Sequence, residues 1–330
     1  MNENIIMNEK NFLLADFHGA HYNIALHTSR IPWIYDNPAY NPSKPFHFKY
    51  NNPYAVNLKS HNEDILNNCL NIMPKGSRLI VIGDFAYNDH RYFIERLKEK
   101  AATLVFITGN HDKAPNDFYN VFRNSAIPED MFDVKKECMS WLKRFRNGDV
   151  NIEDCRDGII SATWAKFANL NDWEMADQMS KECLNLFDNV HEMGWRTTIN
   201  KQNVTFCHYG MRTWASSFHG SILVHGHSHG RLPEFDNMLS CDADCGLWGY
   251  SVLPWCAVVE KMRLKQEWMA KNGKYPVDGE NRAEGQYSKD PNTRVLETRA
   301  KNKEIMRSLG YPIDDRMWPT TILKWPTQDN

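Results

Sequence analysis

Five short apolar segments of this chain each run into a group of Asp, Asn or His residues. Each segment begins with apolar residues that favour a strand, and its polar residues stand where that strand is expected to end. The five segments are Asn11–Gly19, Arg78–His90, Thr103–Lys113, Asn203–Gly210 and Ser221–Gly230. The fold must therefore accommodate five strands whose ends carry polar side chains.

The stretch between the second and third of these strands has the spacing of a helix. Apolar side chains recur every four residues at Phe93, Leu97 and Ala101, which is typical of an amphipathic helix. A strand, a helix and a further strand in succession indicate a parallel sheet. In open α/β sheets the groups that carry out chemistry gather at the carboxyl ends of the strands, which is where all five polar groups stand.

The polar residues have the chemistry of a metal site. On an extended chain alternate residues point to one side, so His225, His227 and His229 can share a face until a glycine bends the backbone. We expect a structural role for His225. Nitrogen and oxygen donors without cysteine suit Mn, Fe, Ni or Zn in an open site better than a closed structural zinc site. The candidate ligands are Asp16, His18, Asp84, Asn110, His208, His227 and His229.

Composition limits the classes of function. With 330 residues, of which 42% are hydrophobic and 24% charged, the chain can bury a sizeable core. A formal net charge of -2 gives no global field that would attract long nucleic acid or an anionic membrane. The eight cysteines are scattered without a CxxC motif, and no leader-like or membrane-spanning segment stands out. We therefore expect a cytoplasmic protein, in the host cytoplasm if the source is viral.

The order of the motifs resembles that of the calcineurin-like metallophosphoesterase superfamily, from about Phe12 to about Val259. The matching motifs are D-x-H at Asp16–His18, G-D at Gly83–Asp84, G-N-H-D at Gly109–Asp112, the single His208, and G-H-x-H at Gly226–His229. Local phrases such as CHYGMRTW are similar to a branch frequent in bacteria and their phages. This chain departs from that branch at Gly210, where proline is usual. It also departs after Asp84, where only Asn88 or Asp89 can supply a further polar residue. Neither departure removes a candidate ligand.

The resemblance implies a four-layer α/β/β/α sandwich, which we place at residues 1–260. Residues 113–200, approximately, are far more than a sheet connection needs and are rich in helical signals, so we expect a helical cap there. Residues 261–330 would form a helical and irregular C-terminal extension. We also expect Asp242–Glu260 to supply closing strands of the second sheet and Arg294–Leu309 to form a helix.

The resemblance also implies how the ligands divide between two divalent transition metals, of which manganese is favoured. Asp16, His18 and His229 would hold one ion, Asn110, His208 and His227 the other, and Asp84 would bridge both. In such a centre a hydroxide that bridges the metals attacks phosphorus directly.

The same resemblance assigns roles to His111 and Asp112. His111 would donate a proton to the leaving oxygen, and Asp112 would orient His111. Arg212 and His21 are candidates for binding the substrate. The planar guanidinium of Arg212 matches a phosphate, although a surface ion pair explains it equally well.

We therefore expect a phosphoester hydrolase that acts on phosphodiester or nucleotide-like substrates, without a membrane partner. Two alternatives remain open. One is a phosphomonoesterase or protein phosphatase. The other is a non-catalytic binding protein that uses metal for stability, against which the complete ligand set and His111 argue.

Overall fold

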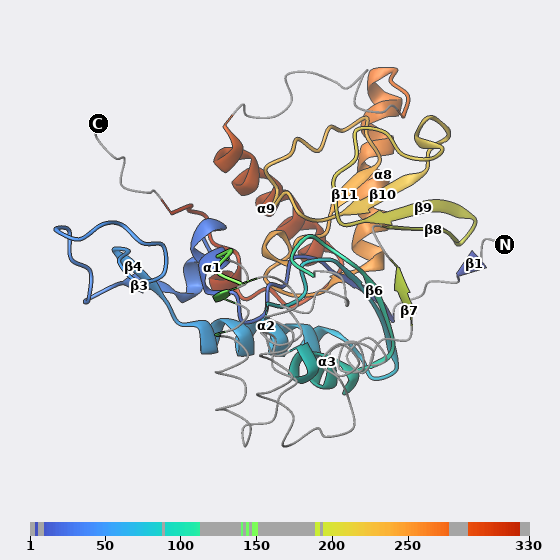
Figure 1. The fold of residues 1–330 in the computed structure, drawn as a ribbon. Coiled ribbons are helices and arrows are strands. Elements are labelled where there is room, and N and C mark those ends of the chain that lie inside the picture. The colour runs from blue at the N-terminus through green and yellow to red at the C-terminus, as the bar shows by residue number, and fades with distance from the viewer. Residues whose placement is uncertain are drawn as a thin grey trace, which may run out of the picture.

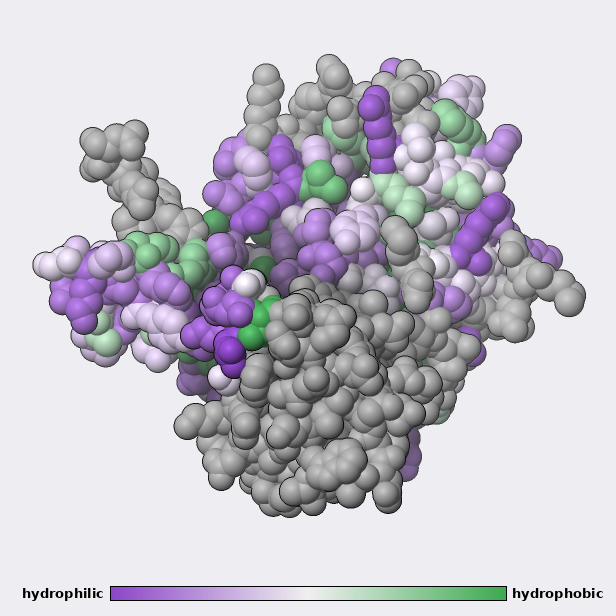
Figure 2. Space-filling model, viewed as in Figure 1, coloured by the Kyte–Doolittle hydropathy of each residue, from purple (hydrophilic) through white to green (hydrophobic). Residues whose placement is uncertain are grey.

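The fold was analysed in a computed structural model (Figure 1). It describes residues 4–5, 10–87, 90–112, 140, 143–144, 147–150, 189–191, 194–276 and 290–323. The described parts form a mixed α/β structure with two five-stranded sheets. The surface visible in Figure 2 is largely hydrophilic where it is described, with scattered apolar residues.

The first sheet contains the strands that carry the first three motifs. Its strands are β2 (Asn11–Leu14), β5 (Ser77–Ile82), β6 (Ala101–Ile107), β7 (Asn189–His191) and β12 (Leu253–Pro254). The order is β12-β2-β5-β6-β7, and all neighbours are parallel except β12 and β2. Helix α3 (His90–Lys98) lies between β5 and β6 in the chain, which confirms the predicted succession of strand, helix and strand.

The second sheet carries the last two motifs. Its strands, in spatial order, are β1 (Asn4–Ile5), β8 (Gly194–Ile199), β9 (Gln202–Cys207), β10 (Ile222–His225) and β11 (Ser240–Asp242). Only β8 and β9 pair in the antiparallel direction. The turn between them has positive φ at both Asn200 and Lys201, as tight hairpins require. A separate antiparallel pair consists of β3 (Ile34–Asp36) and β4 (Tyr54–Val56).

Helices lie beside both sheets. They are α1 (Tyr22–His27), α2 (Leu58–Ile72), α8 (Trp255–Asn272) and α9 (Pro291–Ser308), with short 3-10 turns at Ile31–Trp33, Ser217–His219, Cys245–Leu247 and Asp315–Met317. Figure 1 shows α2 and α3 on one side of the molecule and α8 and α9 on the other. At the start of α9, Asp290 accepts a hydrogen bond from the amide of Thr293, a typical N-cap. This helix confirms the one predicted at residues 294–309.

The two sheets share one hydrophobic core. A single cluster of buried side chains includes Phe12 and Leu79 from the first sheet and Phe206 and Val224 from the second. Sheets that share a core can hold their strand ends in fixed positions relative to each other. The order of four layers stays a prediction, and most of the predicted cap lies outside the described residues.

Two segments differ from the expectation. Residues 242–260 do not supply closing strands of the second sheet, because β11 ends at Asp242 and β12 pairs with β2 of the first sheet. The apolar residues from Trp255 onward looked like an alternating strand, but Trp255, Val258 and Met262 share the buried face of α8. At the end of the predicted cap, residues 189–191 form β7 and residues 194–199 form β8. No helix within the described ranges is long and apolar enough to cross a membrane.

Candidate metal centre

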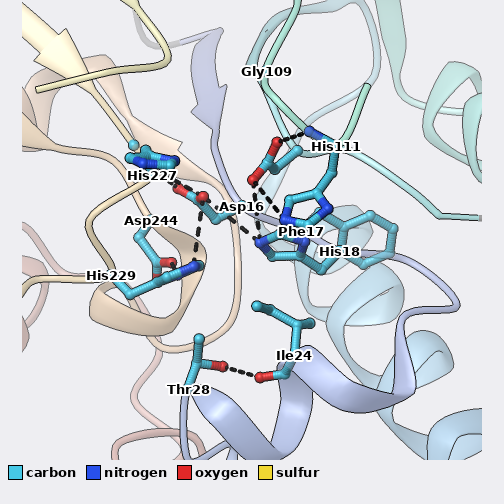
Figure 3. Close-up of polar contacts among 12 residues, drawn as sticks. Asp16, Phe17, His18, Ile24, Thr28, Gly109, His111, His227, His229 and Asp244 are labelled. Carbon is cyan, nitrogen blue, oxygen red and sulfur yellow. Dashed lines mark hydrogen bonds and ion pairs between the residues drawn. The ribbon is translucent and has the colours of Figure 1, made fainter. Parts of the chain in front are cut away.

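All five predicted strand ends meet at one place. β2, β5 and β6 end there from the first sheet, and β9 and β10 end there from the second. Figure 3 shows Asp16 and His18 from the first sheet facing His227 and His229 from the second. The residues gather into two groups, each of which could hold one metal ion.

The first group, here called the Asp16 cluster, consists of Asp16, His18 and His229. One ligand atom from each lies within 4.8 Å of the others. Asp16 Oδ1 lies 3.7 Å from His18 Nε2 and 4.0 Å from His229 Nε2. These distances leave room for a cation between the donors. The Asp16 carboxylate also accepts hydrogen bonds from the amide of His227, at 2.9 and 3.1 Å.

The second group, the Asp84 cluster, consists of Asp84, His208 and His227, again with ligand atoms within 4.8 Å of one another. Asn110 joins it, since its Oδ1 lies 3.0 Å from His208 Nε2. Asp84 Oδ2 lies 3.3 Å from His208 Nε2 and 3.6 Å from His18 Nε2. Asp84 therefore stands between the two clusters.

The backbone at these residues is unusual. Five of the seven candidate ligands have φ between 49° and 67°, a left-handed conformation that residues other than glycine seldom adopt: Asp16, His18, Asp84, His227 and His229. Each such residue costs about 1–3 kcal/mol, and strain of this kind gathers at functional sites. Tight turns directly after the strands thus aim successive side chains into the centre.

The glycines of the motifs make room for the carboxylates. A Cβ on Gly226 would collide with Asp16 Oδ2, and one on Gly109 would lie 2.5 Å from both the amide nitrogen and Oδ1 of Asp84. Such contacts are too short for any other residue. The G-H-x-H and G-N-H-D patterns therefore need glycine because a ligand carboxylate packs directly on the backbone.

The electrostatics of the Asp16 cluster fit a cation. Burial, followed by the charges of Asp244 and Asp242, raises the pKa of Asp16 well above its usual value. Burial, followed by the charge of His229, lowers the pKa of His18 well below its usual value. His18 Nε2 is buried and has no hydrogen-bond partner, although two carboxylates stand nearby. A divalent cation would offset the repulsion between carboxylates and give this nitrogen a partner, so the donor set fits a metal.

In the Asp84 cluster, Asp84 and His208 partly stabilise each other's charge. Burial alone would lower the pKa of His208, but the hydrogen bond and charge of Asp84 outweigh it and raise the pKa. For Asp84, burial is opposed by the same hydrogen bond and charge, and the pKa falls below its usual value. His208 Nδ1 lies 3.1 Å from the Ile82 carbonyl oxygen, which fixes the ring.

Comparison with known proteins identifies the family. The model of the calcineurin-like phosphoesterase family matches residues 13–231, about two thirds of the chain. The chain belongs to this family. It is therefore a metal-dependent phosphoesterase, and the resemblance seen in the sequence is confirmed. The family implies divalent metal ions and a phosphoester substrate.

Other comparisons add little. No curated protein matches the chain. Among solved structures, a protein of unknown function from Aquifex aeolicus is 14% identical, with a TM-score of 0.38. That match covers 77% of the present chain and 99% of the other.

In this phosphoesterase, His111 stands at the rim of the centre. Its amide donates to Asp84 Oδ1 at 2.8 Å, its Nε2 lies 4.0 Å from Asp84 Oδ2, and its side chain is 37% exposed. Asp112 is buried, and its carboxylate accepts from the amides of Phe85 and Gly109 at 2.8 and 2.9 Å. Burial and then the charge of Asp84 raise the pKa of Asp112 to about 7. These contacts join two loops, and the orienting role of Asp112 toward His111 stays a prediction.

The structure brings one of the two substrate-binding candidates to the centre. The ring of His21 lies 5.1 Å from that of His111 and 5.6 Å from that of His18, and it stacks on Tyr87 at 4.7 Å. Arg212 is exposed on the loop after β9. It lines a cavity of about 350 Å³ whose wall also includes the buried His225.

Three supporting residues escaped the sequence analysis. Asp244 contacts His229, and Asp242 accepts hydrogen bonds from residues on both sides of His229. Arg30 is buried and donates to the carbonyl oxygens of Asp16 and Phe17. The Asp-Ala-Asp sequence, which begins at the last residue of β11, repeats the pattern of polar residues at a strand end, and that signal could have revealed the first two. No local sequence pattern indicates that Arg30 supports the centre.

Proposed function

We propose that this phosphoesterase hydrolyses phosphodiester or nucleotide-like substrates at a centre that holds two divalent metal ions. The position of Asp84 carries the proposal, because one carboxylate oxygen lies within 3.6 Å of imidazole nitrogens from both clusters. A single oxygen in that position suits a bridging ligand. We further infer that manganese is the favoured metal, since the sites combine imidazole with several oxygen donors.

The ligands divide as the clusters do. The Asp16 cluster would hold one ion, the Asp84 cluster with Asn110 would hold the other, and Asp84 would contact both. Two such ions, when bound, would lower the pKa of water at the centre and stabilise the charge that develops on the phosphate. The chain itself contributes rigid positioning, because the buried carboxylates and the strained turns fix the donors before any ion binds.

His111 has the position of a general acid. Its backbone is anchored on Asp84, while its ring reaches the exposed rim, where a substrate can approach. Nε2 can hold a proton and pass it to a leaving oxygen. Asp112 ties the loop of His111 to the loop of Phe85, which keeps the ring close to both clusters.

Aromatic rings beside the centre support a nucleotide-like substrate. Tyr209 is 37% exposed and lies edge-on to His227 at 4.8 Å, while Tyr87 stacks on His21 on the other side. Exposed aromatic rings can stack on bases. In this proposal His21 binds the substrate beside His111, and Arg212 binds a more distant part of it.

The domain organisation belongs to the same proposal. We propose a phosphoesterase domain with four layers at 1–260, a helical cap within about 113–200 and an extension at 261–330. The core that both sheets share supports the first of these, and Met262, Val295 and Ile305 of the extension pack into the same core. A cytoplasmic location is supported by the free thiols of Cys69, Cys207, Cys241, Cys245 and Cys256.

Hydrolysis of matched small esters tests the proposal. The protein, loaded with Mn²⁺, should hydrolyse bis(p-nitrophenyl) phosphate faster than p-nitrophenyl phosphate and lose activity to a chelator. A screen of cyclic, linear and capped nucleotides would then define the substrate. Faster turnover of the monoester would favour a phosphomonoesterase or protein phosphatase instead. No turnover with both sites loaded would favour the non-catalytic binding protein.

A further inference from the structure

Asp244 lies just beyond the motifs, yet it is in direct contact with a candidate ligand. It follows β11 and is 3% exposed. Its Oδ2 contacts Nδ1 of His229 (Figure 3), and its amide donates to Asp242 Oδ1 at 3.0 Å. The carboxylate is thus held in place by its own backbone and presents one oxygen to the imidazole.

The contact with Asp244 determines which ring nitrogen of His229 carries the hydrogen. The other nitrogen keeps a free lone pair that points toward the Asp16 cluster. A carboxylate can only accept a hydrogen bond, so Nδ1 must be the donor and carry the hydrogen. Nε2 of the neutral ring is then the acceptor, and it is the nitrogen that faces Asp16 Oδ1. A metal ligand needs that lone pair at Nε2, and a carboxylate behind the ring increases its basicity.

Asp242 holds the backbone on both sides of His229. Its Oδ2 accepts from Ser228 Oγ at 2.6 Å and from the amide of Gly230 at 2.9 Å. These two bonds secure the turn in which His229 has a φ of 49°. The ring and the main chain of this ligand are therefore each fixed by a buried carboxylate.

The Asp84 cluster has no equivalent support among its described contacts. Nδ1 of His208 meets the neutral carbonyl oxygen of Ile82, at 3.1 Å. The ring of His227 is exposed and packs on Tyr209. In a buried place a charged acceptor acts more strongly than a neutral carbonyl.

We infer that Asp244 is a positioning residue for His229 and makes the Asp16 cluster the tighter of the two metal sites. The first equivalent of metal would then fill the Asp16 cluster, and the second would fill the Asp84 cluster with lower affinity. The inference rests on the proposed assignment of ligands to two metals. It concerns affinity, and it does not depend on which ester is hydrolysed.

Metal titration of the apoprotein provides the test. Free and bound Mn²⁺ would be measured by electron paramagnetic resonance for the wild type and for Asp244→Asn. The wild type should show a tight and a weak equivalent. Asp244→Asn keeps the shape of the side chain but removes its charge, so the tight equivalent should weaken about 10- to 100-fold. The weak equivalent should be unchanged.

A matched variant controls for the loss of a carboxylate in general. Asp64 in α2 accepts a hydrogen bond from the ring nitrogen of Trp33 at 2.9 Å, away from the candidate ligands. Asp64→Asn should leave both affinities unchanged. Unchanged affinities in folded Asp244→Asn, or an equal loss at both sites, would overturn the inference.

A second pair of variants covers the case in which Asp244→Asn does not fold. His229→Ala should lose the tight equivalent, whereas His227→Ala should lose the weak one, with folding checked by circular dichroism. The opposite result would overturn the order of the sites. Failure of the proposed function has a different signature, namely two bound metals without ester hydrolysis.

Discussion

The Asp16 cluster and the Asp84 cluster use the same kinds of ligand but differ in their surroundings. Asp16 and His18 are almost completely buried, and a carboxylate supports His229. In the Asp84 cluster, Asp84 and His208 are equally buried, but Asn110 and His227 are exposed, and a backbone carbonyl supports His208. The supporting carboxylate, Asp244, lies outside the family motifs. If both clusters hold a metal as proposed, this difference would suit one to retain its ion and the other to meet the substrate.

Removal of the residue that both clusters share should have the largest effect. Asp84→Ala deletes the carboxylate between His18 and His208, so both metals should be lost or poorly ordered. A catalytic metal contributes several kcal/mol, and the rate of ester hydrolysis should fall by about a thousandfold or more. Mass spectrometry measures the metal content of the variant, and single-substrate kinetics measure its rate of hydrolysis.

A comparison with His229→Ala sharpens the result for Asp84. That variant removes a ligand of the Asp16 cluster alone and should mainly weaken one site. Full metal occupancy in Asp84→Ala would show that the clusters do not share this residue.

The second effect separates the proposed acid from the ligands. His111→Ala should keep its metals, since the Asp84 cluster and Asn110 remain intact. Nitrophenolate leaves without a proton, whereas an alkoxide does not, so the loss should reach about a hundredfold on nucleoside or alkyl esters and be much smaller on nitrophenyl esters. Both substrates should be assayed on one preparation. Equal losses on both would mean that His111 binds phosphate or organises the metals.

The third effect should fall mainly on the Asp16 cluster. In Gly226→Ala the added methyl group collides with the Asp16 carboxylate, and overpacking of this kind costs about 1–3 kcal/mol. The melting temperature and the affinity of the tighter site should both fall. Gly273→Ala is the control, because Gly273 ends α8 with a φ of 59° and no atom within 4 Å of an added Cβ. It should lose about 1 kcal/mol of stability and no metal affinity. A similar metal effect in both variants would contradict the explanation for Gly226.

Sequence reasoning located the candidate ligands because each follows a strand within a short motif. Strand pattern and residue type are local, so the carboxyl ends of β2, β5, β6, β9 and β10 could be placed without a structure. The family then supplied their division between two metals. Neither source distinguished the two clusters.

What the sequence missed depends on contacts between distant segments. Asp244 contacts His229 from the segment that follows β11, and Arg30 reaches the carbonyl oxygens of Asp16 and Phe17 from beyond α1. No local period encodes such contacts. The same limit applies to β12. A strand of two residues is too short to show in the sequence that it pairs with β2 of the first sheet and does not belong to the second.

The smallest predicted effect concerns the open side of the centre. The ring of Tyr209 lies edge-on to His208 at 5.2 Å and to His227 at 4.8 Å, and such contacts are worth about 0.5–1.5 kcal/mol. Tyr209→Leu removes the ring, so the weaker metal site should lose affinity by about two- to tenfold while the tighter site is unchanged. Tyr209→Phe keeps the ring and should behave like the wild type in metal binding. A loss at the tighter site, or the same loss in Tyr209→Phe, would show that this ring does not act through the exposed histidine. Because the aromatic surface also faces solvent beside the centre, Tyr209→Leu should raise KM for nucleotide esters more than for small alkyl esters.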